Sequence, residues 1–188
     1  MTELEAVNSL LAAIGQVGVA SLQPKDSNVS VEQALRELRR TSRQVQTKGW
    51  HWNTLEDYPL TPGTDGTVQL PSNVLKVDTV GVSGDVDAVQ RGRRLYNRDA
   101  NNFTFGGAVK VRLVEALEWD DLPACAQWYV MVKATRRFAT AKLASDTANK
   151  FTTQDEQEAL IDLEQFEAES DDRTMRQASP HVARMRRS

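Results

Sequence analysis

The chain has 188 residues, of which 40% are hydrophobic and 26% are charged, and its formal net charge is -3 at pH 7. This length suits one domain, or one domain with an insertion, and it can bury a core without a metal or disulfide staple. The net acidity argues against a protein that is basic throughout and binds nucleic acid with its whole surface. The single cysteine, Cys125, excludes an internal disulfide, and two histidines are too few for a zinc cluster.

No apolar run approaches the roughly 20 residues that a membrane span needs. The N-terminal stretch MTELEAVNSLLAAIG is too acidic and too amphipathic for a signal peptide. We therefore expect a soluble protein made in a reducing cytoplasm, with no membrane partner, no bound metal and no cofactor.

The first part of the chain predicts two helices. Thr2 and Glu5 have the spacing of a capping box, apolar residues then recur at helical spacing, and Gly15 can end the helix. After a loop, Ser30 begins a second capping-box pattern and a long helix that Gly49 ends. The expected buried stripes are Leu4, Val7, Leu11 and Ile14 in the first helix and Val31, Ala34, Leu35, Leu38 and Val45 in the second.

Between Trp50 and Trp119 short β-prone runs alternate with glycine and proline, which indicates antiparallel sheet. The runs are TVQL, NVLKVDTVGV, VDAVQ, RRLYN, NFTF and VKVRLV. In FTFGGAVKV we expect a hairpin with Gly106 and Gly107 at the turn, because glycine tolerates positive φ at both positions.

Helices return after this stretch. Asp120 or Asp121 can cap a helix that has Pro123 in its first turn and the apolar run LPACAQWYVMVKATRRFATAKLA. A last helix is expected from Thr152 or Thr153 onward. Its buried stripe is predicted to be Ala159, Leu160, Leu163 and Phe166.

The order of these elements predicts an α+β fold. We expect a mainly α-helical bundle formed by the N- and C-terminal helix pairs, residues 1–49 and 120–172. A small antiparallel β-domain, residues 50–119, is inserted between the pairs. Residues 173–188 form an extended, basic C-terminal arm, because Pro180 and the lack of periodicity argue against a helix there.

The stretch TKGWHWNTLEDYPLTP places Trp50, His51 and Trp52 where the helical pattern gives way to the sheet pattern. In an extended WHW the two indoles point to one side and His51 points to the other. The indoles could stack on nucleic-acid bases or close the joint between the two parts. The next dozen residues carry acids and no Lys or Arg, which favours the domain joint, with His51 at the surface.

The densest group of candidate acid–base residues is Glu115, Glu118, Asp120 and Asp121. Two of them precede a predicted helix, where a carboxylate also complements the helix dipole. The chain shows no glycine-rich phosphate loop and no Ser or Cys nucleophile with a suitably placed histidine. We therefore expect no catalytic site and no enzyme.

A cluster of arginines lies in the β-prone part: Arg91, Arg93, Arg94 and Arg98. These residues could contact DNA phosphates or an acidic partner. They could equally protect an exposed strand edge from aggregation.

Two further charged runs lie on predicted helices. Arg36, Arg40 and Arg43 recur at i, i+4 and i+7 and so share one side of the second helix. The last helix carries nine carboxylates between Asp155 and Asp172 and no Lys or Arg. Each run is either a solvated face or one of two complementary faces in a ring of subunits.

Three motifs, AVNSLLAAIGQVGVASL, RQVQTKGWHWNT and LPACAQWYVMVKATRRF, are followed by an acidic last helix. In order and spacing they resemble the tail tubular protein A family of T7-like short-tailed phages. The matching positions are Val7, Asn8, Gly15, Leu22, Gln46, Gly49, Trp50, Asn53, Pro123, Lys133, Ala134, Arg136 and Phe138. The β-rich part matches more loosely, and GQVGV stands where the family often has proline, which leaves the first loop's conformation open.

The resemblance implies a structural head-to-tail adaptor in the virion tail or neck, assembled in the host cytoplasm. It would be a homo-oligomeric ring, expected to be a dodecamer, that joins the portal protein to the tail nozzle protein (tail tubular protein B). The ring would support the attachment of tail fibres and prolong the channel, through which genomic DNA passes without sequence-specific binding. The alternative is a non-viral helical interaction module or nucleic-acid-binding module.

A ring predicts particular contacts. At the subunit interface we expect Arg36, Arg40 and Arg43 to face carboxylates on a neighbour's last helix, namely Glu158, Asp162 and Glu169. The basic arm is expected to bind the portal through Arg173, Arg176, Arg184, Arg186 and Arg187, with avidity from repetition around the ring.

Overall fold

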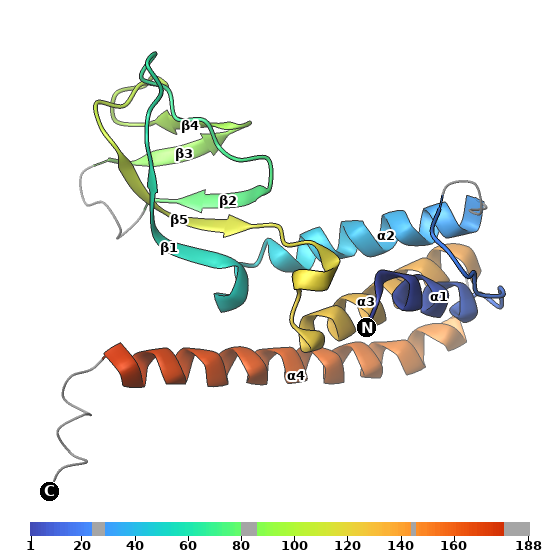
Figure 1. Cartoon of the computed structure of the whole chain (residues 1–188). Coiled ribbons are helices and arrows are strands. Elements are labelled where there is room, and N and C mark those ends of the chain that lie inside the picture. Colours follow the sequence, from blue (N-terminus) through green and yellow to red (C-terminus); the bar gives the residue numbers. More distant parts are fainter. Residues whose placement is uncertain (24–28, 80–85, 144–145, 179–188) are drawn as a thin grey trace, which may run out of the picture. The chain divides into compact units, whose positions relative to one another are not determined.

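The structure, a computed structural model, describes residues 1–23, 29–79, 86–143 and 146–178 (Figure 1). The helices are α1 (Glu3–Ala13), α2 (Val29–Gln46), α3 (Ala124–Leu143) and α4 (Asp146–Ala178). The strands are β1 (Thr54–Leu60), β2 (Val74–Asp78), β3 (Ala88–Arg91), β4 (Arg94–Asn97) and β5 (Val109–Glu115), and short 3-10 turns span His51–Asn53 and Trp119–Asp121. The fold is α+β, as the sequence predicts.

The chain divides into two compact units, which we describe separately. A helical unit contains residues 1–42 and 118–188, and a β-rich unit contains residues 43–117. Among the described residues, none of the helices combines the length and the apolar character that a membrane span requires.

The helical unit begins with the predicted capping box. The Glu5 backbone N–H donates to Thr2 Oγ1 at 3.2 Å, and the Thr2 backbone N–H donates to Glu5 Oε2 at 2.8 Å. The hydrogen bond from the Thr2 backbone lowers the pKa of the Glu5 carboxyl. Glu5 therefore favours the folded chain above its unfolded pKa, and this contribution is lost as the pH falls through the folded value.

The loop after α1 is held by Asn8. Its Nδ2 donates to the Val19 carbonyl at 3.0 Å, and its Oδ1 accepts from the Val19 N–H at 2.8 Å. A Cβ added at Gly18 would lie 3.0 Å from Asn8, so the glycine allows this close approach.

Within the helical unit, α1 and α4 both pack against α3. Arg39 of α2 forms a two-pronged ion pair with Glu3 of α1, with N–O distances of 2.8 and 3.0 Å. The helix α2 begins at Val29, so Ser30 lies in its first turn and not before it, and residues 24–28 lie outside the described part.

Two predicted helix starts are wrong. Asp120 and Asp121 do not cap α3, because they form a separate 3-10 turn and α3 begins only after Pro123. The last helix begins at Asp146, earlier than Thr152, and continues to Ala178. Residues 173–178 are thus helical, and the rest of the expected arm lies outside the described residues.

In the β-rich unit, β5 lies at the centre of an antiparallel sheet of order β1–β5–β2. Leu60 of β1 pairs with Val109, and Val77 of β2 pairs with Leu113. Strand β1 carries a bulge between Leu55 and Tyr58, where Asp57 has a φ of 53°. An extra residue in a bulge bends the strand and increases its twist.

The hairpin predicted at Gly106 and Gly107 is wrong, because β5 pairs with β1 and β2 and not with residues 102–105. The actual hairpin is β3–β4, in which Arg91 pairs with Arg94 around Gly92 at a φ of 63°. The runs TVQL and NFTF form isolated bridges only, among them Thr67 with Thr104. Strand β1, which the sequence analysis did not predict, takes the edge position beside β5.

The core of the β-rich unit is one apolar cluster shared by both sheets. Its members are Leu60, Val68, Leu70, Val74, Val77, Ala88, Leu95, Phe105, Val109, Val111 and Leu113. Thr79, which follows β2, joins it to β3, because Thr79 Oγ1 accepts from the Ala88 N–H at 3.1 Å and donates to the Ala88 carbonyl at 3.2 Å. The β-rich unit therefore has a hydrophobic core formed by its own residues.

Candidate functional site

The WHW stretch caps the C-terminal end of α2. The indole Nε1 of Trp50 donates to the Val45 carbonyl at 2.9 Å, and Asn53 Nδ2 donates to the Gln46 carbonyl at 3.0 Å and the Glu115 carbonyl at 2.9 Å. The last carbonyls of a helix have no partner within the helix. These side chains supply partners for two of them and attach the end of β5.

Two more residues, Gln46 and Gly49, complete this cap network. The Gln46 side chain donates to the Leu117 carbonyl at 3.1 Å and accepts from the Leu117 N–H at 2.7 Å. Gly49 has a φ of 79°, and a Cβ there would lie 3.1 Å from a Val114 methyl. The positions Gln46, Gly49, Trp50 and Asn53 thus share one structural task.

The two tryptophans differ in exposure. Trp50 is buried and Trp52 is half-buried, and their rings stack with centroids 6.4 Å apart and planes 9° from parallel. The stretch is not extended as predicted, since residues 51–53 form a 3-10 turn, but His51 is exposed as expected. Trp52 Nε1 is buried and has no hydrogen-bond partner among the described residues.

Helix α2 presents its arginines away from the core. Its buried side chains include Val31, Ala34, Leu38, Thr41 and Val45. Arg36, Arg40 and Arg43 are all exposed. At about 100° per residue these three arginines lie on the side of the helix opposite the buried stripe.

Helix α4 carries an acidic stripe on one side: Asp155, Glu158, Asp162 and Glu169, all exposed. Phe166 follows the same spacing, i, i+3, i+7, i+11 and i+14 from Asp155, and is 39% exposed. The sequence analysis assigned Phe166 to the buried stripe, which is wrong. The buried residues of this helix that the structure describes are Ala159 and Leu163.

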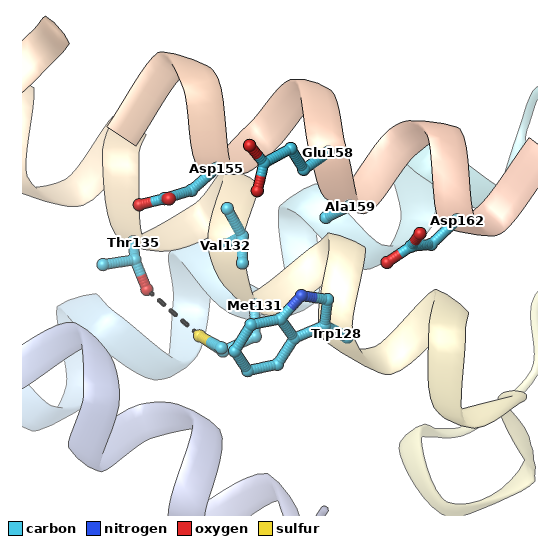
Figure 2. Close-up of a pocket in the computed structure, with 8 residues that line it drawn as sticks. All are labelled: Trp128, Met131, Val132, Thr135, Asp155, Glu158, Ala159 and Asp162. Atoms are coloured by element: carbon cyan, nitrogen blue, oxygen red, sulfur yellow. Dashed lines mark hydrogen bonds between the residues drawn. The ribbon is translucent and has the colours of Figure 1, made fainter. Parts of the chain in front are cut away.

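A groove of about 300 Å³ runs between α3 and α4 beside this stripe. Figure 2 shows its two sides, with carboxylates from α4 above and the Trp128 indole from α3 below. The lining residues are Trp128, Met131, Val132 and Thr135 of α3 and Asp155, Glu158, Ala159 and Asp162 of α4. Trp128 is 50% exposed, so a large aromatic face stays open to a partner.

The seam between α3 and α4 is fixed by ion pairs next to the groove. Glu156 of α4 pairs with Lys133 at 3.3 Å and with Arg136, both on α3. All three side chains are at least two-thirds buried, so these contacts are shielded from solvent more than a surface ion pair is. Through these contacts Lys133 and Arg136 hold α4 against α3.

On the β3–β4 hairpin the arginines stack on aromatic rings. The Arg91 guanidinium lies 3.4 Å from the Tyr96 ring centroid, and Arg94 lies 4.3 Å from that of Phe103. The two rings meet edge to face at 5.0 Å. Arg98 does not join them, because it forms an ion pair with Asp87 at 2.9 Å.

The structure does not assemble an acid–base pair from the four clustered carboxylates. Glu115 accepts a hydrogen bond from Asn73 Nδ2 at 3.0 Å, while Glu118, Asp120 and Asp121 are exposed. Nor do three His, Cys, Asp or Glu side chains of the described ranges gather as metal ligands. Cys125 is half-buried, and burial raises the pKa of its thiol.

Of the arginines expected to bind the portal, Arg173 and Arg176 lie in the last turns of α4. Arg184, Arg186 and Arg187 lie outside the described residues. Among the described side chains, no ion pair joins Arg36, Arg40 or Arg43 to the acidic stripe of the same chain.

Sequence reasoning missed Trp128 and Asp155. Trp128 stands in a run that is apolar on several sides, so its position alone does not show that half of it is exposed. Asp155 could have been predicted from the sequence, because Asp155, Glu158 and Asp162 are spaced i, i+3 and i+7 and so share one side of a helix.

Comparison with known proteins gives the family to which this chain is similar. A family model described as tail tubular protein matches residues 4–173. The chain is also 31% identical over 147 residues to tail tubular protein A of Klebsiella phage KP34, which covers 78% of this chain and 76% of that relative. The matched range includes residues of both compact units.

Proposed function

From the premise that this chain belongs to the tail tubular protein family, we propose that it forms the head-to-tail adaptor ring of a short-tailed phage. Membership makes it a structural protein of the phage tail and not an enzyme. In the proposal the ring joins the portal protein to the nozzle protein, supports the tail fibres and prolongs the channel for genomic DNA. Twelve subunits are expected, assembled in the host cytoplasm.

The observation that carries this proposal is the breadth of the family match. It spans residues 4–173, which takes in the helices that the structure describes, from the second residue of α1 to the last turns of α4, and all the described strands. The chain therefore has the parts of a tail tubular protein, and not one shared motif within an unrelated protein. The cap network at Gln46, Gly49, Trp50 and Asn53 gives the family-matched positions a concrete structural reason.

The charged faces support a ring. Arg36, Arg40 and Arg43 lie opposite the buried stripe of α2, and the proposed contacts Glu158, Asp162 and Glu169 lie along one exposed side of α4. A closed ring repeats a heterologous contact, in which one face of a subunit meets a different face of the next. One basic face and one acidic face meet that requirement.

The remaining assignments belong to the same proposal. Trp50 and Trp52 stabilise the joint at which the helical pattern passes to the β-rich part. The C-terminal arginines bind the portal, and two of them, Arg173 and Arg176, belong to the last turns of α4. Repeated around a ring, such weak contacts add up to strong attachment.

Co-sedimentation with the cognate portal protein tests this function. Purified chain and portal are mixed at low salt and separated on a density gradient, with nozzle protein added in a second run. We expect a portal complex in the first run and a complex of all three proteins in the second. If both proteins are folded and the chain stays at the top of the gradient, the adaptor proposal is wrong.

A further inference from the structure

The groove between α3 and α4 has the chemistry of a binding site for arginine side chains. Its floor is apolar, with Met131, Val132 and the open face of Trp128. Its rim carries Asp155 and Asp162, neither of which has an ion-pair partner among the described residues. A guanidinium can stack on an indole while its N–H groups reach carboxylates, and the aliphatic stem of arginine covers apolar surface.

The arginines of α2 match this rim in spacing. Counted backward from Arg43, the steps to Arg40 and Arg36 are three and four residues. Counted forward from Asp155, the steps to Glu158 and Asp162 are also three and four residues. Each set spans about 10.5 Å of helix, so two antiparallel helices bring all three pairs into register.

We propose that α2 of one subunit lies antiparallel in the α3–α4 groove of the next subunit. Arg43 faces Asp155, Arg40 faces Glu158 beside Trp128, and Arg36 faces Asp162. This contact rests on the proposed ring, and it replaces Glu169 with Asp155 as the third acidic partner.

Each stripe brings like charges close together in the isolated subunit, although Arg40 also forms an exposed ion pair with Glu37 at 3.9 Å. The repulsion within each stripe favours pairing with a stripe of opposite charge. On α2 the like charges are the three arginines, at i, i+4 and i+7. On α4 they are the three carboxylates Asp155, Glu158 and Asp162, at i, i+3 and i+7. Like charges at this spacing destabilise a helix. Placing one stripe against the other adds attractions between opposite charges, and these attractions offset the repulsion within each stripe.

We take the occupant to be a second copy of the chain, because a ring brings one face of each subunit against a different face of the next. Arg36 and Arg40 face away from the buried stripe with which α2 packs in its own unit. They are therefore presented to a neighbour.

Charge reversal tests the pairing. Arg40→Glu and Glu158→Arg are each expected to lower ring formation on the portal at least about tenfold, because like charges then face each other in the contact. The double variant, Arg40→Glu with Glu158→Arg, restores the attraction and is expected to recover assembly. Glu164→Arg makes the same charge change on the opposite side of α4 and serves as the control, with melting curves to show that every variant is folded.

Cross-linking tests the orientation. In a Cys125→Ser background, single-cysteine variants are mixed and joined by a short bismaleimide, at high concentration alone and again on the portal. Arg43→Cys with Asp155→Cys, and Arg36→Cys with Asp162→Cys, are expected to link different subunits. The pairs 43 with 162 and 36 with 155 should give at least about tenfold less product, because they lie about 10.5 Å further apart along the helices.

The outcomes separate this contact from the adaptor function. Suppose that wild-type rings form on the portal, but Arg40→Glu assembles normally and the antiparallel pairs do not cross-link. The proposed contact between α2 and the groove is then wrong, while the adaptor proposal is unaffected. If the wild-type chain does not bind the portal, the adaptor proposal is wrong. Cross-linking of the concentrated chain alone then still tests the proposed contact between subunits. Linkage of the two other pairs would overturn the antiparallel orientation.

Discussion

At the residue scale, the end of α2 shows how a few side chains stabilise the point where a helix passes into a sheet. Asn53 is 2% exposed and uses its amide on three backbone groups, including the Trp50 N–H, which donates to Asn53 Oδ1 at 2.8 Å. Buried polar groups that lose their partner carry a desolvation cost. Asn53 therefore stabilises the fold by binding backbone groups from distant parts of the chain, and it is more than a local turn residue.

Replacing this amide should be costly. We expect Asn53→Ala to lower the free energy of unfolding by about 1–3 kcal/mol, because it leaves buried backbone groups without partners. The neighbouring His51→Ala, at an exposed position, should change it by no more than about 0.5 kcal/mol. Urea denaturation of both variants makes the comparison, and equal small effects would show that the cap network contributes little.

The two tryptophans should rank by burial. Trp50→Ala is expected to cost about 3–5 kcal/mol, because a buried ring is removed and a cavity remains. Trp52→Ala should cost clearly less, since Trp52 is only half-buried and its Nε1 makes no hydrogen bond within the described residues. The reverse ranking in the same denaturation assay would contradict the placement of the two rings.

Sequence patterns predicted side-chain hydrogen bonds well where the two partners are close in the chain. The capping box of Thr2 and Glu5 is confirmed because both residues lie within one helical turn. The partners of Asn53 and Gln46 near Glu115 and Leu117 are more than 60 residues away, so no local pattern could identify them. The exposure of Trp128 and Phe166 likewise depends on which helices pack nearby.

At the element scale, the long α4 is placed by its contacts with α3. Apolar residues Ala159 and Leu163 pack inward, and Glu156 binds two cations of α3. The sequence analysis began this helix about six residues late because it relied on a threonine cap. In the sheet, β5 pairs on both sides, and its partners β1 and β2 lie far from it in sequence, which is why a local hairpin was the wrong prediction.

Removing one charge at the α3–α4 seam should loosen α4. We expect Glu156→Gln to reduce the free energy of unfolding by about 1.5–3 kcal/mol, because Lys133 and Arg136 lose a charged hydrogen-bond acceptor. Glu158→Gln, two residues further on but exposed, should leave the stability of the isolated subunit nearly unchanged. Thermal and urea unfolding of both variants test this, and a smaller loss for Glu156→Gln than for Glu158→Gln would contradict the role of the seam.

At the scale of the whole molecule, the proposed function makes the chain one subunit of a larger assembly. Its exposed features are the arginine face of α2, the acidic groove beside α4 and the stacked arginines of the β3–β4 hairpin. Among the described residues, no three His, Cys, Asp or Glu side chains gather in a group that could hold a metal ion. In the proposal these exposed features are surfaces for contact with other subunits and other virion proteins.

The C-terminal segment should act in attachment and not in folding. A chain that ends at Ala178 keeps α4 and loses Arg184, Arg186 and Arg187, and we expect it to melt as the full chain does but to bind the portal more weakly at physiological salt. A full-length variant with these three arginines changed to glutamine should behave in the same way if charge is the cause. Undiminished portal binding by the shortened chain would show that the anchor lies elsewhere.

The most direct test of the central claim is cryo-electron microscopy of the phage particle. We predict that the helical and β-rich units of this chain will fit a ring of density between the portal and the tail nozzle, with the DNA channel running through its centre. Density for the chain at another position in the virion, or no ring between portal and nozzle that its fold can occupy, would contradict the adaptor function.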